Sequence, residues 1–231
     1  MTLPAPYYEH AGITIYHGDC REILPGLEPV DLVLTDPPYG IGEDGGQKNR
    51  WRTGDGRRKD GPLKYQKMDW DRARPSSDTF AQIMSMGERC AIFGGNHFAD
   101  LLPPSGGWLF WDKNIGGDFS DGELVYTNFG NAIRKHTVHA FKDLRGGKDR
   151  VHPTQKPAEI MTWCIRQADK HFKPHASTIL DPYMGSGTTL VAAKQLNRRA
   201  IGIEIEEKYC EIAARRLSQE VFDFSAAADG Q

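Results

Sequence analysis

Two short apolar stretches in this chain each end at an aspartate that opens a tight loop. Asp31-Leu-Val-Leu-Thr35 leads into Asp36-Pro-Pro-Tyr39, and Thr178-Ile-Leu180 leads into Asp181-Pro-Tyr-Met-Gly-Ser-Gly-Thr-Thr189. Short apolar runs bounded by Pro and Gly are typical of buried strands. In open α/β sheets, ligands bind beyond the carboxyl ends of the strands. The pair therefore predicts an α/β fold in which two ligands meet at one edge of a sheet.

The length and composition of the chain fit one large globular domain. Its 231 residues suffice for a sizeable core, and 39% hydrophobic and 26% charged residues are ordinary proportions. The last third alternates expected strands and helices, at residues 178–180, 186–196, 200–204 and 206–217. Such alternation predicts a parallel sheet. We therefore expect a mostly parallel twisted sheet with helices on both faces, in one domain of residues 1–221, followed by a flexible tail at 222–231.

Charge is distributed unevenly along the chain, although the net charge is only −2. Residues 47–67 hold eight Lys or Arg against two acidic residues, and residues 134–152 hold six against two. The first run lies in the stretch 41–75, which is rich in Gly and has almost no apolar periodicity. A loop of that length is usually functional or disordered. The segregation predicts a surface that meets a polyanion, the alternative being that each basic run is merely solvated.

Cysteine and hydropathy patterns argue against several classes of protein. The four cysteines, Cys20, Cys90, Cys164 and Cys210, are at least 46 residues apart, which leaves no CxxC motif for zinc. No apolar stretch approaches the roughly 18 residues that span a membrane. The N-terminal stretch lacks the basic and apolar regions of an export signal. We expect a cytoplasmic protein with reduced thiols, no metal and no membrane contact.

The loop after Asp181 has the pattern of a nucleotide site. Gly185 and Gly187 lack a Cβ and would let a ligand approach the backbone closely. Glu204 ends the next expected strand, at about the spacing where nucleotide-binding βαβ units place a ribose acceptor. No Lys follows the glycines, and Leu190 stands where a dinucleotide fingerprint has its third Gly. An adenosyl ligand with a cationic tail, S-adenosylmethionine (SAM), therefore fits better than a pyrophosphate; a structural tight turn is the alternative.

These motifs resemble those of the beta-group DNA amino-methyltransferases, which use SAM. Asp181–Thr189 is similar to that family's cofactor loop, with Tyr183 where Phe is more common. Residues 151–157 are similar to the segment that helps to hold the methionine moiety, and Gly18-Asp19-Cys20 to the element near the adenine. The resemblance implies a Rossmann-like methyltransferase fold in which the target-base loop precedes the cofactor loop, a circularly permuted order. The implied cofactor-binding residues are Asp19, Cys20, Asp36, Lys156, Asp181, Pro182, Tyr183, Gly185, Gly187, Thr188, Thr189 and Glu204.

The Asp36–Tyr39 loop suits methyl transfer to an exocyclic amine. The nitrogen lone pair of such an amine is delocalised into the ring, so acceptors for both N–H groups would favour its reactive form. Asp36 and the Pro37 carbonyl provide such acceptors, and Pro38 stiffens the loop. The Tyr39 ring provides a face on which an extruded base could stack. We take Asp36, Pro37, Pro38 and Tyr39 as catalytic candidates, the alternative being a rigid turn capped by Asp36.

The resemblance favours methylation of adenine N6 in double-stranded DNA. The family's cytosine-N4 members more often carry Ser in place of Asp36, and none of the four cysteines follows a proline, as the nucleophile of cytosine-C5 enzymes does. Cytosine N4, an RNA or protein-glutamine substrate, and an inactive DNA-binding subunit are the alternatives. A homodimer and a cognate restriction nuclease are left open.

The variable segments of the resembled family correspond to residues 41–75 and 113–150, which we expect to contact DNA. Basic and aromatic side chains in the first segment are candidates for backbone contact and base readout. The DNA-binding candidates are Lys48, Arg50, Trp51, Arg52, Arg57, Arg58 and Lys59.

Overall fold

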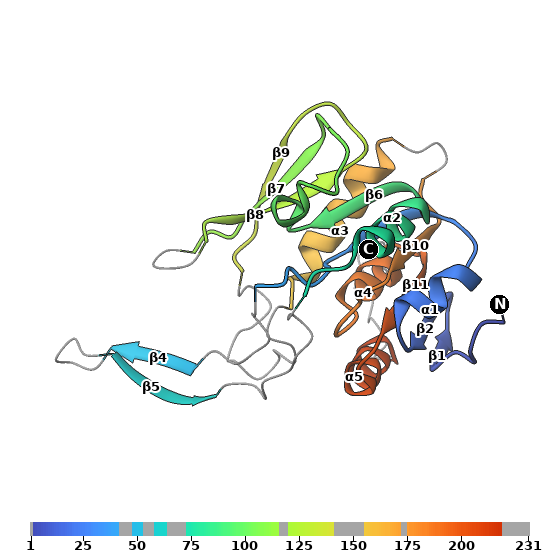
Figure 1. The fold of residues 1–231 in the computed structure, drawn as a ribbon, viewed down its shortest axis with the longest axis horizontal. Helices are drawn as coiled ribbons and strands as arrows, with labels where there is room; N and C mark the ends of the chain where they lie inside the picture. The colour runs from blue at the N-terminus through green and yellow to red at the C-terminus, as the bar shows by residue number, and fades with distance from the viewer. Residues whose placement is uncertain are drawn as a thin grey trace, which may run out of the picture.

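The computed structural model describes residues 2–41, 73–115, 120–140, 155–171 and 175–218, and the backbone of 48–52 and 58–63. Figure 1 shows helices packed against a large twisted sheet. The elements in chain order are β1 (Tyr8–His10), β2 (Ile13–His17), α1 (Cys20–Ile23), η1 (Leu24–Gly26), β3 (Val30–Thr35), β4 (Lys48–Arg52), β5 (Arg58–Leu63), α2 (Ser77–Ser85), β6 (Gly87–Phe93), η2 (Gly95–Phe98), β7 (Trp108–Asp112), β8 (Gly122–Thr127), β9 (Arg134–Thr137), α3 (Ala158–Asp169), β10 (Thr178–Asp181), α4 (Thr188–Gln195), β11 (Arg199–Glu204) and α5 (Glu207–Ser218).

The large sheet has nine strands in the order β1-β2-β11-β10-β3-β6-β8-β7-β9. Its centre is parallel, because β2, β11, β10, β3 and β6 pair in the same direction. Antiparallel pairing appears where β1 joins β2 and where β8 joins β6 and β7. A mostly parallel sheet with crossover helices is the expected Rossmann-like arrangement, so the fold prediction is confirmed.

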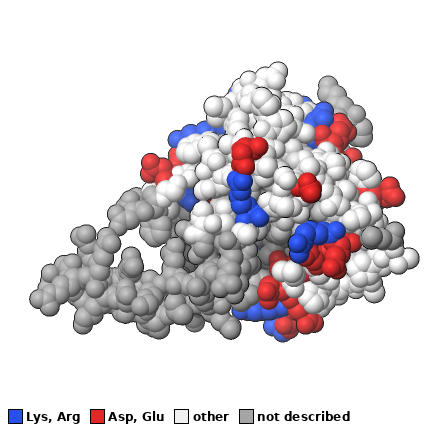
Figure 2. All heavy atoms as spheres, viewed as in Figure 1, with Lys and Arg blue, Asp and Glu red and all other residues white. Residues whose placement is uncertain are grey.

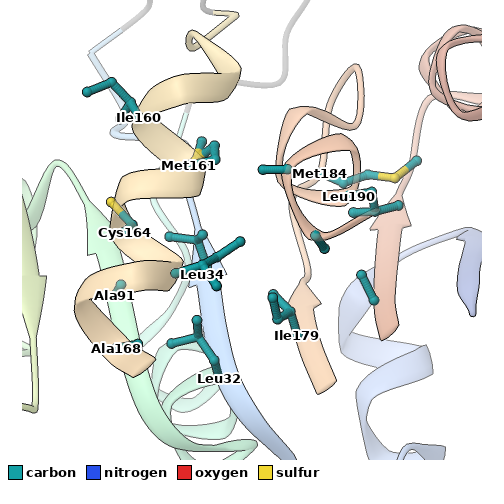
Figure 3. Close-up of a cluster of buried hydrophobic side chains, with 14 of the residues drawn as sticks. Leu32, Leu34, Ala91, Ile160, Met161, Cys164, Ala168, Ile179, Met184 and Leu190 are labelled. Atoms are coloured by element: carbon teal, nitrogen blue, oxygen red, sulfur yellow. The ribbon is translucent and has the colours of Figure 1, made fainter. Parts of the chain in front are cut away.

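Side-chain alternation along the central strands builds a core on each face of the sheet. Leu32 and Leu34 of β3 belong to the cluster that contains buried residues of α3, α4 and α5. Val33, between them, points to the opposite face and belongs to the cluster that contains residues of α1 and α2. Figure 3 shows Leu32 and Leu34 of β3 beside α3. Helices therefore cover both faces, as the near-continuous apolar strands predict.

The parallel centre brings four acidic residues to one edge of the sheet. The strands β2, β11, β10 and β3 are neighbours in that order and run in the same direction. Asp181 and Glu204 are the last residues of their strands, Asp36 directly follows β3, and Asp19 lies two residues after β2. The two loops are far apart in the sequence, and the pairing of β3 with β10 brings them close together in space.

The expected elements of the last third are found within two residues of their predicted ends. The stretch 41–75, expected to be a loop, contains the antiparallel strands β4 and β5. Their sequences are polar, so they carry no period-two apolar signal. The strand β9 spans Arg134–Thr137, and Pro157 is the N-cap of α3. The tail 222–231 lies outside the described residues.

Gly187, at the N-cap of α4, is required by its conformation and by helix packing. Its φ is +78°, and a Cβ there would lie 2.7 Å from the Cβ of Ala213 in α5. We expect Gly187→Ala to lower the free energy of unfolding by about 1–3 kcal/mol, because it adds both backbone strain and overpacking. Urea unfolding would measure the loss. Gly106→Ala is the matched control, since the nearest atom to its Cβ would be 3.6 Å away; equal stability of the two variants would contradict this account.

Candidate functional site

Asp181 is a buried junction between two strands and a helix. Its Oδ1 accepts a hydrogen bond from Thr35 Oγ1 at 2.7 Å and one from the backbone N–H of Tyr183 at 3.1 Å. Its Oδ2 accepts from Thr189 Oγ1, in the first turn of α4, at 2.6 Å. The side chain is only 3% exposed. Asp181 therefore fixes the start of the glycine loop, and the hydroxyl of Thr189 helps to hold Asp181 in place.

Glu204 holds the other end of the same loop. Its Oε2 accepts from the backbone N–H of Gly185 at 3.0 Å, and its Oε1 accepts from the N–H of Glu206 at 2.9 Å. Gly185 adopts a φ of +51°, in the left-handed region that favours glycine. Each carboxylate oxygen of Glu204 keeps a second lone pair, so the residue is able to accept a further hydrogen bond from a ligand hydroxyl.

Burial leaves these two carboxylates with unusual proton affinity. Desolvation raises the pKa of Asp181 to about 6, against the hydrogen bonds from Thr189 and Thr35 that lower it. Desolvation also raises the pKa of Glu204 to about 7. Among the described residues, no cationic side chain forms an ion pair with either one. A positively charged ligand at this edge would favour both ionised forms.

Asp36 sits next along the edge and is bound on both oxygens. Tyr39 Oη donates to Asp36 Oδ1 at 2.5 Å, and Lys156 Nζ donates to Asp36 Oδ2 at 2.7 Å. Burial raises the pKa of Asp36, while the ammonium of Lys156 opposes that rise. The Asp36 side chain is still 20% exposed. It is the acidic group of this loop that remains open to a ligand.

Lys156 also reaches a second carboxylate, on β8. Its Nζ lies 3.1 Å from Glu123 Oε2, and Glu123 Oε1 in turn lies 2.7 Å from Lys113 Nζ. Lys156 is 7% exposed, and its ammonium lies 5.2 Å from the centre of the Phe93 ring. The two carboxylates raise the pKa of Lys156 although burial alone would lower it. The expected cofactor residue Lys156 is therefore placed against Asp36.

Tyr39 packs on the turn that follows β6. Its ring is stacked on His97, with centroids 4.7 Å apart and planes 12° apart, and it meets Phe98 edge-on. A Cβ on Gly94, whose φ is +62°, would lie 2.3 Å from the Tyr39 ring. The half-buried ring is thus held in place by η2 before any ligand binds.

Asp19 and Cys20 lie at the end of β2 but face different surroundings. The Asp19 side chain accepts from the backbone N–H of Arg21 at 2.9 Å and pairs with the Arg21 guanidinium, which lowers the pKa of Asp19. Cys20 is buried in the core cluster against which Tyr183 packs. Arg21 therefore binds both carboxylate oxygens of Asp19 at this edge, whereas Cys20 contributes packing.

The rear of the glycine loop is fixed by α5. Arg216 Nη1 donates to the Ser186 carbonyl at 2.5 Å and to Thr188 Oγ1 at 3.2 Å. Pro182, Gly187 and Thr188 are buried. Of the loop residues expected to bind a cofactor, Tyr183 and Gly185 are the partly exposed ones, and the buried ones shape the loop.

The DNA-binding candidates are separate from this edge in the sheet topology. Lys48, Arg50, Trp51 and Arg52 form β4, Arg58 and Lys59 begin β5, and Arg57 lies outside the described residues. Figure 2 shows no large field of one charge on the face in view, because Lys and Arg atoms lie beside Asp and Glu atoms. Arg74–Asp100 and Lys135–Asp112 are pairs of this kind.

Two negative observations hold for the described part of the chain. It contains no cluster of three or more His, Cys, Asp or Glu side chains that could hold a metal ion. Within the same residues, none of the helices combines the length and apolarity needed to span a bilayer.

Several site residues carry no signal in the sequence. Glu123, Lys113 and His97 lie in segments without a recognisable motif and reach the site only through the folding of the sheet. Thr35 is the last residue of an apolar strand, where nothing local indicates that its hydroxyl points at Asp181. Arg216 is recognisable only as a charge suited to the dipole of its helix. Each of these contacts joins residues at least 28 positions apart, except the Glu123–Lys113 pair.

Comparison with known proteins supports the resemblance seen in the motifs. The family model described as DNA methylase, for N6 and N4 methyltransferases, matches residues 125–215. The Type II methyltransferase M2.DpnII of Streptococcus pneumoniae is 26% identical over 95% of this chain and 95% of its own length. The chain is therefore similar to N6/N4 DNA methyltransferases, and the resemblance carried by its motifs is confirmed.

Solved structures share the fold at lower identity. The crystal structure of the M1.HpyAVI–SAM complex has a TM-score of 0.58 and 23% identity, over 90% of this chain and all of that chain. The cytosine-N4-specific PvuII DNA methyltransferase has a TM-score of 0.58 and 15% identity, over 97% and 93% of the two chains. At these identities, the two structures show that they share the fold of this chain and nothing more specific.

The raised pKa of Glu204 makes a prediction about stability. Its pKa of about 7 exceeds the usual value of 4.5, so the folded state binds the proton more tightly than the unfolded state does. Stability should therefore fall as pH rises from about 4.5 through 7. In Glu204→Gln, which stays neutral, this fall should be smaller by about 1–3 kcal/mol. Urea unfolding between pH 5 and 8 would measure both proteins, and identical slopes would rule out the burial effect. Glu88→Gln, an exposed carboxylate, is the control.

Proposed function

We propose that this protein is a SAM-dependent, site-specific DNA methyltransferase that methylates adenine N6 in double-stranded DNA. The observation that carries the proposal is the Asp36–Tyr39 loop, whose partly exposed carboxylate directly follows β3. Next to it, β10 and β11 end in two buried carboxylates that lack a cationic partner among the described residues. The same edge of the sheet thus places a hydrogen-bond acceptor for an amine beside two carboxylates that would stabilise a bound cation.

The residues of β10 and β11 fit SAM. When bound, SAM supplies a methyl group made electrophilic by its sulfonium. Glu204 has free lone pairs for ribose hydroxyls, and Gly185 brings backbone close to the ligand without a Cβ. The raised pKa values of Asp181 and Glu204 would fall beside a cation, so positive charge is favoured there. The M1.HpyAVI structure, which shares the fold, is a complex with the same ligand.

Asp36 acts on the target amine. Its Oδ1, which accepts from Tyr39 Oη in the free protein, keeps a second lone pair for an N–H of that amine, and the Pro37 carbonyl accepts the other N–H. Two acceptors localise the nitrogen lone pair, and the carboxylate stabilises the positive charge that develops on the nitrogen. Lys156 holds Oδ2, which leaves Oδ1 for the base.

Tyr39 supplies the stacking surface for an extruded base. A base within the duplex is unreachable, so the enzyme has to hold it outside the stack. The Tyr39 ring rests on His97 and Phe98, which fixes its plane in advance and lowers the entropy cost of stacking.

Adenine N6 is favoured over cytosine N4 by Asp36, since the resembled cytosine-N4 enzymes more often have Ser at that position. The cytosine-N4-specific PvuII enzyme shares the fold, so the fold does not discriminate between the two bases. Modified-base sequencing of DNA from cells that express the protein would identify both the base and its sequence context. N4-methylcytosine without N6-methyladenine would contradict the choice of adenine.

Asp36 is the side chain on which turnover should depend most. We expect Asp36→Ala to lower methyl transfer by about 100-fold or more, because it removes a preorganised acceptor. Asp36→Asn should be nearly as impaired, since the amide lacks the charge that stabilises the developing ammonium. Transfer of tritiated methyl groups from SAM to plasmid DNA would measure both.

The control for Asp36→Asn is Asp78→Asn, which removes an exposed carboxylate from the first turn of α2. It should retain wild-type turnover. An Asp36→Ala protein that keeps more than about a tenth of the wild-type rate would exclude this mechanism. A loss of less than about tenfold is smaller than the loss expected when one transition-state contact is removed.

The β4–β5 hairpin is proposed as a DNA backbone contact. Neutralising Arg57, Arg58 and Lys59 together should flatten the slope of log K against log salt by up to about 2.7, at roughly 0.9 for each phosphate contact. Fluorescence anisotropy with a labelled duplex would measure the slope. Neutralising Lys170, Lys208 and Arg215, which lie outside the basic runs, should leave the slope unchanged. If both triple variants match the wild-type slope, these three charges are merely solvated.

A further inference from the structure

Lys156 stands between two carboxylates that come from different parts of the sheet. Its ammonium is 2.7 Å from Asp36 Oδ2 and 3.1 Å from Glu123 Oε2. Asp36 follows β3, Glu123 lies near the start of β8, and Lys156 precedes α3. Lys113, after β7, lies 2.7 Å from the other oxygen of Glu123. These ion pairs connect Lys113 to Glu123, Glu123 to Lys156 and Lys156 to Asp36. The charges therefore alternate in sign along the series and sum to zero.

Removing one charged residue from this series would leave its partner buried without a compensating charge. Lys156 is almost fully buried, and a buried ammonium is stable only when carboxylates compensate for the water it has lost. Without Lys156, Asp36 and Glu123 would be two neighbouring carboxylates in a poorly hydrated site, and one of them would take up a proton. Without Glu123, the full charge of Lys156 would act on Asp36.

We propose that Lys156 and Glu123 are positioning residues that together set the ionisation and orientation of Asp36. The inference rests on the proposed function, and it extends that function to two residues that do not touch the target base. Lys156 holds Oδ2 and keeps Asp36 ionised, so that Oδ1 faces the amine. Glu123 anchors Lys156 from the opposite side and moderates its pull on Asp36, which preserves enough basicity in Oδ1 for it to accept the amine N–H.

The charged and titratable groups that face Asp36 act in opposite directions. Lys156 favours its ionised form, and the hydroxyl of Tyr39 does so by hydrogen bonding. Glu123 on β8 and Asp181 at the end of β10 disfavour it through like charge. Removing Lys156 and removing Glu123 should therefore shift the titration of Asp36 in opposite senses, which a loss of packing alone would not do.

The test is the titration of Asp36 in the full chain. Carboxyl ¹³C NMR of protein labelled at aspartate, with the signal assigned by its loss in Asp36→Asn, would report the apparent pKa without DNA or methyl transfer. We expect Lys156→Met to raise it by about 1–3 units, the usual effect of losing a close opposite charge. Glu123→Gln should lower it. Lys170→Met and Glu88→Gln, surface changes of the same kind, should leave it unchanged.

Methyl transfer as a function of pH gives the second readout. The acid limb of the profile should move to higher pH in Lys156→Met and to lower pH in Glu123→Gln. Should Lys156→Met fail to fold, the direction of the Glu123→Gln shift decides alone. An Asp36 titration unchanged in Glu123→Gln overturns the proposal. So does a Lys156→Met protein whose only defect is weaker SAM binding by calorimetry, because Lys156 would then be a cofactor ligand. Absence of methyl transfer by the wild-type protein would refute the proposed function and leave the NMR titration interpretable.

Discussion

The carboxylate of Asp181 joins the end of β3, the glycine loop and the first turn of α4 through Thr35, Tyr183 and Thr189. A buried carboxylate is tolerated only when its oxygens are hydrogen-bonded, and this one accepts three such bonds. Its cost is therefore offset by contacts that fix a strand end, a loop and a helix relative to one another. Because Asp36 directly follows Thr35, the same junction also sets where the Asp36 loop begins.

The two halves of this edge differ in how their negative charge is balanced. At the β3 end, Asp36 pairs with the ammonium of Lys156. Lys156 also pairs with Glu123, and Glu123 pairs with Lys113, so the four charges sum to zero. At the β10 and β11 ends, the partners of Asp181 and Glu204 among the described residues are N–H and O–H donors and not cations, and burial raises their pKa values. The first arrangement suits a neutral ligand that donates hydrogen bonds, such as an aromatic amine. The second leaves a charge deficit that a cationic ligand would fill.

Sequence reasoning succeeds where a local pattern determines the structure and fails where pairing of distant segments does. The strands β3, β10 and β11 are apolar runs bounded by Pro, Gly or acids, and their pairing follows from the βαβ order. The motif around Lys156 assigns that residue to the cofactor, but its contact with Asp36 spans 120 positions. Glu123 belongs to no motif, and only the antiparallel placement of β8 brings it there. The polar strands β4 and β5 have no apolar alternation to reveal them.

Tyr39, the proposed base-stacking residue, is linked to the 41–75 segment through Gly40 and Arg74. Gly40, immediately after Tyr39, has a φ of +72°, and a Cβ there would be 3.0 Å from the backbone nitrogen of Arg74. The two ends of the 41–75 segment therefore lie side by side. Arg74 also donates to the carbonyl of His97 and pairs with Asp100, so it ties the exit of the insertion to the turn on which Tyr39 is stacked. A duplex contact made by the 41–75 segment would consequently act on residues anchored beside Tyr39, the proposed stacking surface for the base.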